Sequence, residues 1–110
     1  MIKNSQDQQL IHDDLTFLKA DPLASFDMKW LEDGEVDGVI IEYRKDLSVL
    51  ELINDIRSHN NREVYLMPVF LYKIHGQTNP AISQLADGEI TNLSNLNPIA
   101  DITKKIKSRL

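Results

Sequence analysis

The chain contains no cysteine among its 110 residues. Thiol redox chemistry, cysteine nucleophiles, zinc–thiolate sites and disulfide frameworks are therefore excluded, and a reducing, cytoplasmic environment fits the composition. With 42% hydrophobic residues, a chain of this length can bury a core without such links. We therefore expect residues 1–110 to form a single domain, and this domain could be the N-terminal part of a longer protein.

Long apolar runs are also missing. The first ten residues are mostly polar and lack the apolar segment of a signal peptide. The longest apolar run covers residues 64–72, is interrupted by Pro68, and falls far short of the roughly 20 residues that cross a bilayer. The sequence predicts neither secretion nor a membrane span.

Basic charge is scarce. The formal net charge is −5, and the excess of acidic residues lies in residues 1–46. A protein that binds nucleic acid generally presents a basic face. The candidates for such a face are Lys104, Lys105, Lys107 and Arg109, but cations at the end of a helix are already favoured by the helix dipole. We therefore expect no direct binding of nucleic acid.

The N-terminal third predicts a helix and then a strand. Ser5 and Gln8 have capping-box spacing, and helical spacing of Ile11, Leu15 and Leu18 predicts a helix over residues 5–20. Further on, Phe26, Met28 and Trp30 alternate with polar residues, which predicts a short strand over residues 26–31.

Residues 36–43 are predicted to form the central strand, because Val39, Ile40 and Ile41 make a continuous β-branched run typical of a strand covered on both faces. The segment between Leu31 and Val36 is too short for a parallel crossover. If residues 26–31 and 37–43 are adjacent strands, they form an antiparallel hairpin around Asp33 and Gly34. The sheet would then be mixed.

A second helix is predicted to begin at a capping box formed by Ser48 and Glu51, with Leu47 and Leu52 placed as a hydrophobic staple. We expect it to bury one stripe and to end near His59; the stripe consists of Val49, Ile53 and Ile56. The apolar run over residues 64–72 predicts a second buried strand, in which Pro68 indicates a missing ladder bond or a bulge.

The C-terminal third predicts a short helix over residues 80–85, capped by Asn79, and a turn at Gly88 that leads into residues 89–91. A last helix is predicted with Asn97 as its cap and Pro98 as its first helical residue, and we expect it to run to the chain end. Its expected core stripe consists of Ile99, Ile102, Ile106 and Leu110.

Three segments carry a resemblance to a known family: residues 37–42 (DGVIIE), residues 67–72 (MPVFLY) and residues 85–92 (LADGEITN). They resemble the third, fourth and fifth strands of a bacterial response-regulator receiver. The resemblance covers about two-thirds of the chain and implies an α/β fold. The expected architecture is a flavodoxin-like, receiver-type sheet flanked by helices and truncated or mixed at its N-terminal side.

The resemblance places Glu42 at the position that accepts phosphate in a receiver. The family's hydroxyl residue falls near Tyr72 or Lys73, and its characteristic lysine falls on Asn92. The acidic pair that holds magnesium has no equivalent, because no apolar first strand precedes the first predicted helix. Asp13 and Asp14 lie inside that predicted helix, where adjacent side chains point about 100° apart.

Glu42 leaves two interpretations open: its carboxylate could mimic a phosphorylated acceptor, or it could simply face water at a strand end. Asp46 is a second candidate acceptor, although a role at the following helix start explains it better. The histidines at positions 12, 59 and 75 have no metal-ligand spacing, so we expect no metal and no cofactor. Trp30 could anchor a partner or pack in the core.

The favoured function is a non-catalytic signalling or regulatory module that resembles a receiver without phosphoacceptor chemistry. The alternatives are an active, magnesium-dependent phosphoacceptor receiver and a small-ligand sensor at the carboxyl ends of the strands. The expected partner is a second copy, bound through residues 79–110, or a fused output domain.

Overall fold

Strands and helices alternate along the chain. The structure, a computed structural model, describes residues 9–12, 14–20, 29–32, 36–43, 47–73 and 79–109, with residues 29 and 30 described by their backbone alone. In chain order, the elements are β1 (Gln9–His12), β2 (Leu15–Ala20), α2 (Lys29–Glu32), β3 (Gly38–Glu42), α3 (Ser48–Arg57), α4 (Arg62–Tyr65), β4 (Val69–Tyr72), α5 (Pro80–Ser83), β5 (Gly88–Ile90) and α6 (Asn97–Lys107).

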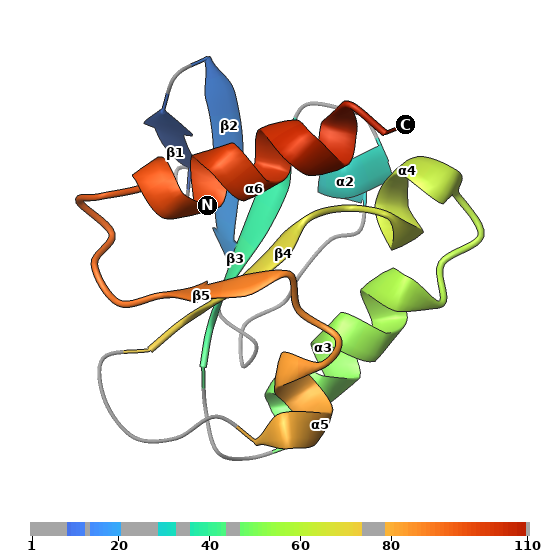
Figure 1. The fold of residues 1–110 in the computed structure, drawn as a ribbon. Helices are drawn as coiled ribbons and strands as arrows, with labels where there is room; N and C mark the ends of the chain where they lie inside the picture. Colours follow the sequence, from blue (N-terminus) through green and yellow to red (C-terminus); the bar gives the residue numbers. More distant parts are fainter. Residues whose placement is uncertain are drawn as a thin grey trace, which may run out of the picture.

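The strands form a sheet with the order β1-β2-β3-β4-β5, so that β3 lies at its centre (Figure 1). The pairs from β2 to β5 are parallel, and β1 pairs with β2 in the antiparallel direction. The predicted α/β class is therefore confirmed. The sheet is mixed at its N-terminal side as expected, but the antiparallel strand is β1 and not the segment 26–31 from which the mixed sheet was predicted. The predicted central strand is confirmed as well, since Val39, Ile40 and Ile41 are fully buried in β3.

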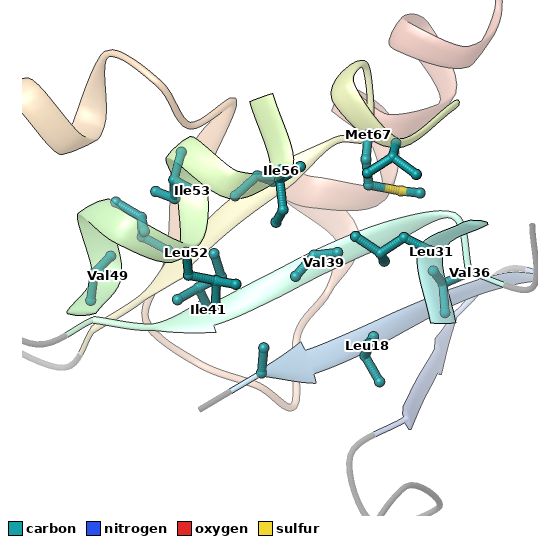
Figure 2. Packing of buried hydrophobic residues seen from close by; sticks show 14 of the residues in the cluster. Leu18, Leu31, Val36, Val39, Ile41, Val49, Leu52, Ile53, Ile56 and Met67 are labelled. Atoms are coloured by element: carbon teal, nitrogen blue, oxygen red, sulfur yellow. The ribbon is translucent and has the colours of Figure 1, made fainter. Parts of the chain in front are cut away.

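Helices cover both faces of the sheet. Because β2 to β5 follow one another in one direction, right-handed crossovers place the connecting helices on one face. α2, α3, α4 and α5 pack there, against Val39 and Ile41 (Figure 2). α6 lies across the opposite face and packs against Phe17, Ile40 and Phe70 (Figure 1). Since side chains alternate along a strand, β3 contributes to both layers.

The predicted helix over residues 5–20 is wrong in its described part, which forms the hairpin of β1 and β2. The expectation that no apolar strand precedes the first helix is wrong for the same reason, because β2 is such a strand and pairs in parallel with β3. Ile11 is 73% exposed, whereas Phe17 is fully buried. β2 is covered on both faces, so its apolar residues show no clean alternation and also match a helical spacing. Asp14, which was expected within that helix, lies in the turn of the hairpin at a φ of 67°, a conformation that aspartate adopts more readily than most residues.

Three details of this N-terminal region lie outside the described residues: the capping pair of Ser5 and Gln8, the position of Asp13, and the predicted strand before Lys29. Where the predicted strand over residues 26–31 is described, it is wrong, because residues 29–32 form α2. The predicted antiparallel hairpin is wrong too, since β3 pairs in parallel with β2 on one side and β4 on the other. The crossover between β2 and β3 spans residues 21–37.

α3 confirms the second predicted helix and its buried stripe of Val49, Ile53 and Ile56. The predicted start is off by one residue, because Ser48 is the first helical residue and Leu47 occupies the N-cap position. The predicted staple is wrong, since Leu47 is 69% exposed. The helix takes its stability from burial on the sheet rather than from that contact.

The predicted strand over residues 64–72 is shortened to β4, because residues 62–65 form the short helix α4. Pro68 lies just before β4 and its carbonyl accepts a hydrogen bond of 2.9 Å from the Val39 amide. The proline therefore precedes the ladder and does not interrupt it.

The C-terminal elements largely follow the prediction. The Asn79 side chain caps α5 by accepting from the Ala81 amide at 2.9 Å, and Pro80 is the first helical residue. The predicted cap of the last helix is off by one residue, because Asn97 is the first helical residue of α6 and Leu96 occupies the N-cap position. Leu110, the last residue of the expected stripe, lies outside the described residues. The fully covered side chains of α6 are Ile99, Ala100 and Thr103, whereas Ile102 and Ile106 are half-buried.

None of the helices formed by the described residues has the length and apolar character that crossing a membrane requires.

The hairpin of β1 and β2 can be tested by two alanine substitutions. Phe17→Ala removes a fully buried ring that contacts Phe70 edge-to-face, with ring centroids 6.3 Å apart. We expect it to lower the free energy of unfolding by about 3–5 kcal/mol. Ile11→Ala, at an exposed position, should change it by less than about 0.5 kcal/mol. Urea denaturation followed by circular dichroism measures both, and equal losses would contradict the hairpin.

Candidate functional site

Glu42 lies at the carboxyl end of β3, on the sheet face that α6 covers. The Nζ of Lys19, from β2, donates to Glu42 Oε1 at 3.2 Å. The side chains of Lys19 and Glu42 are 27% and 36% exposed, so the pair is partly screened by solvent. The parallel register of β2 and β3 pairs Lys19 with Ile40. Glu42 lies two residues after Ile40 on the same face of β3, so its side chain is next to that of Lys19.

Tyr72 and Lys73 follow the same pattern at the end of β4. Tyr72 pairs in register with Glu42 and packs against the cluster beneath α6. Lys73 extends to the opposite face, because consecutive side chains of a strand alternate. There its Nζ lies 3.5 Å from Glu89 Oε1, and the lysine side chain is only 14% exposed. The structure therefore brings Tyr72, but not the Lys73 ammonium group, to the face that carries Glu42.

Asn92, the last of the predicted pocket residues, belongs to the turn between β5 and α6. Its Oδ1 accepts from the Ser94 amide at 2.9 Å, and its carbonyl accepts from the Asn95 amide at 3.1 Å. These contacts explain an asparagine in this turn without a binding role.

The remaining candidates are dispersed. The Nε2 atom of His12 lies 2.7 Å from Asn97 Oδ1, and that of His59 lies 2.7 Å from Glu32 Oε2. His75, Asp46 and the side chain of Trp30 lie outside the described residues. Among the residues that the structure does describe, no group of three or more His, Asp or Glu side chains could hold a metal ion.

Lys19 is the residue of this site that the sequence analysis missed. Lys19 falls within the helix that was predicted over residues 5–20, so its position one strand from Glu42 was not foreseen. The pattern that could have indicated it is the apolar run LTFL before Lys19 and Ala20, which resembles the residues leading into Glu42.

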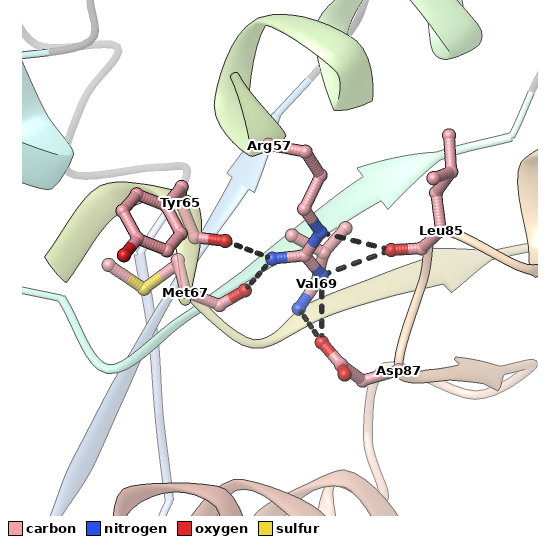
Figure 3. Close-up of polar contacts among 6 residues, drawn as sticks. All are labelled: Arg57, Tyr65, Met67, Val69, Leu85 and Asp87. Atoms are coloured by element: carbon pink, nitrogen blue, oxygen red, sulfur yellow. Dashed lines mark hydrogen bonds and ion pairs between the residues drawn. The ribbon is translucent and has the colours of Figure 1, made fainter. Parts of the chain in front are cut away.

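Arg57, the last residue of α3, is the centre of a polar cluster that joins several segments (Figure 3). Its Nη1 donates to the carbonyls of Tyr65 and Met67 at 3.0 and 2.7 Å. Nε and Nη2 both donate to the Leu85 carbonyl, and Nη2 also donates to Asp87 Oδ2 at 3.0 Å. Every N–H of the guanidinium therefore has an acceptor within the chain.

Asp87 extends this cluster to the sheet. Its Oδ2 also accepts from the Val69 amide at 2.8 Å, and its own amide donates to the Val69 carbonyl at 2.7 Å. Val69 begins β4 and Asp87 directly precedes β5, so these bonds align the starts of both strands. Because all its donors are used internally, Arg57 has a structural role and is not a candidate ligand-binding group.

Comparisons of the chain with protein-family models, with curated proteins and with solved structures find no match.

The structural role of Arg57 predicts a large effect of Arg57→Met, which keeps much of the side-chain volume and removes the donors. Three carbonyls and a carboxylate would lose a charged partner, and we expect the free energy of unfolding to fall by about 3 kcal/mol. Arg109→Met is the matched control, because Arg109 is exposed at the end of α6, and it should cost less than about 0.5 kcal/mol. Urea denaturation of both variants measures these free energies of unfolding. An Arg57→Met variant as stable as the wild type would contradict the structural role of Arg57.

Proposed function

We propose that this chain is a non-catalytic regulatory module of receiver-like, flavodoxin-like architecture that acts in the cytoplasm without being phosphorylated. The parallel strands β2 to β5 support this, with an acidic residue at the carboxyl end of the central strand. The carboxyl ends of parallel strands are where open α/β sheets place their functional groups.

The observation that carries the proposal is the ion pair of Glu42 and Lys19. A glutamate at the acceptor position extends its carboxylate one methylene further than an aspartate, toward the place that a phosphoryl group would take. Lys19 supplies a positive charge to it from β2, whereas the family's lysine position carries Asn92 in a turn. In this proposal, the permanent negative charge of Glu42, held by Lys19, replaces the negative charge that phosphorylation would add.

The competing function is an active phosphoacceptor that requires magnesium, and incubation with acetyl phosphate and magnesium distinguishes the two. We expect the intact mass of the wild type to stay unchanged, as should that of Glu42→Gln, which cannot form an acyl phosphate at this position. A stoichiometric gain of one phosphoryl group by the wild type, but not by Glu42→Gln, would overturn the proposal in favour of an active receiver.

The partner that we propose for this module is a second copy of the chain, bound through residues 79–110. Two features support this surface. Ile102 and Ile106 stay half-buried on α6, and β5 is the last strand in the order of the described strands, so none of them pairs with its outer side. A fused output domain at the same surface is the alternative.

Sedimentation equilibrium tests the dimer. The wild type is expected to associate at high micromolar concentration, and Lys105→Glu should weaken the association, because Lys105 is exposed on α6 and its replacement reverses one charge at the proposed surface. The thermal stability of the variant should match the wild type. A wild type that stays monomeric at this concentration would exclude the homodimer.

A further inference from the structure

Two parallel strand pairs, β2 with β3 and β4 with β5, begin with the same pair of hydrogen bonds. Asp37 directly precedes β3; its amide donates to the Thr16 carbonyl at 2.7 Å, and its Oδ2 accepts from the Thr16 amide at 2.8 Å. Asp87 directly precedes β5 and makes the same two bonds with Val69, at 2.7 and 2.8 Å; Figure 3 shows the side-chain bond. We call this pair of bonds the aspartate clasp.

The residue after each aspartate is a glycine that faces a phenylalanine. The register pairs Phe17 with Gly38 in the first strand pair and Phe70 with Gly88 in the second. A Cβ atom at Gly38 would lie 3.0 Å from the Phe17 ring, and one at Gly88 would lie 3.4 Å from the Phe70 ring and 3.3 Å from Ile102. Both rings are fully buried, so a larger residue would be crowded at either glycine.

The crossovers of the two strand pairs also match. Each contains a four-residue helix, α2 between β2 and β3 and α5 between β4 and β5. Both helices cover the same face of the sheet, because Leu31 of α2 and Ile82 of α5 belong to one core cluster. The likeness therefore extends from the starts of the strands to the connection between them.

A cation from another helix contacts each clasp. Lys107, at the end of α6, donates to Asp37 Oδ1 at 2.6 Å, and Arg57, at the end of α3, donates to Asp87 Oδ2 at 3.0 Å. Each aspartate thus combines a bond to a backbone amide with a bond to a charged group, and bonds that involve charged groups are the stronger ones.

The clasp explains how the register of each strand pair is fixed. Thr16 and Val69 each lie one residue before the first register pair of phenylalanine and glycine, so their amides need an acceptor from outside the ladder. The carboxylate supplies this acceptor. A slip by one residue would move the aspartate away from the amide and the glycine away from the ring, so both contacts oppose it.

We infer that the sheet is built from two equivalent β-α-β units, β2-α2-β3 and β4-α5-β5, each held in register by an aspartate clasp and the glycine that follows it. This inference does not depend on the regulatory function proposed above, because it rests on the amino ends of the strands.

The equivalence also relates the residues at the carboxyl ends. Glu42 lies four residues after the glycine of the first unit, and Asn92 lies four residues after that of the second. Lys19 and Tyr72 each lie two residues after the paired phenylalanine. The ion pair of Lys19 and Glu42 therefore has uncharged counterparts in the second unit.

Native-state hydrogen exchange of the full chain, followed by NMR, tests the two clasps one at a time. Asp37→Ala removes the acceptor of the Thr16 amide, and Asp87→Ala removes that of the Val69 amide. We expect each substitution to speed exchange of its own amide about tenfold relative to the Ile53 amide in α3, the effect of losing one hydrogen bond. The amide of the other clasp should keep its rate relative to Ile53.

Asp101→Ala is the matched control, because Asp101 is exposed on α6, and it should change neither clasp amide relative to Ile53. Asp37→Asn and Asp87→Asn retain a side-chain oxygen, so their clasp amides should exchange at close to the wild-type rate. They also serve if an alanine variant does not fold. The inference is overturned if just one clasp responds, if the clasp amides speed up no more than Ile53, or if the asparagine variants lose protection as fully as the alanine variants.

Discussion

The Arg57 guanidinium is the interaction on which the arrangement of the described elements depends most. It joins the end of α3 to the end of α4 and to the segments that lead into β4 and β5. These segments contain backbone carbonyls that accept no hydrogen bond within a helix or a strand. The planar, permanently charged guanidinium donates to several of them at once. Hydrophobic burial drives the helices onto the sheet, but it is not directional. The hydrogen bonds of the guanidinium are directional, and they orient the end of α3 relative to these segments.

The carboxyl ends of the central strands carry polar side chains whose charges are compensated within the sheet. Glu42 and Tyr72 are the last residues of β3 and β4, Lys19 is the last residue but one of β2, and the ion pair of Lys19 and Glu42 joins two neighbouring strands.

Much of the fold could be predicted from local patterns, whereas the candidate site could not. Glu42 was recognised because it ends a β-branched run, and the cap of α5 because Asn79 and Pro80 form a strong local pattern. Lys19 was missed because its partner is distant in the sequence. Arg57 was missed because its acceptors are mostly backbone carbonyls, which no side-chain pattern reveals.

The sequence by itself determined the α/β class, the central strand, the buried stripe of α3 and the existence of the last helix, because each depends on neighbouring residues along the chain. Tertiary structure decided that residues 9–20 form a hairpin, that residues 29–32 form a helix, and that residues 62–65 leave the strand. The physical reason is that a short apolar segment can satisfy its hydrogen bonds as a helix or as a strand. Only the neighbouring strand or helix against which it packs makes one of these states more stable.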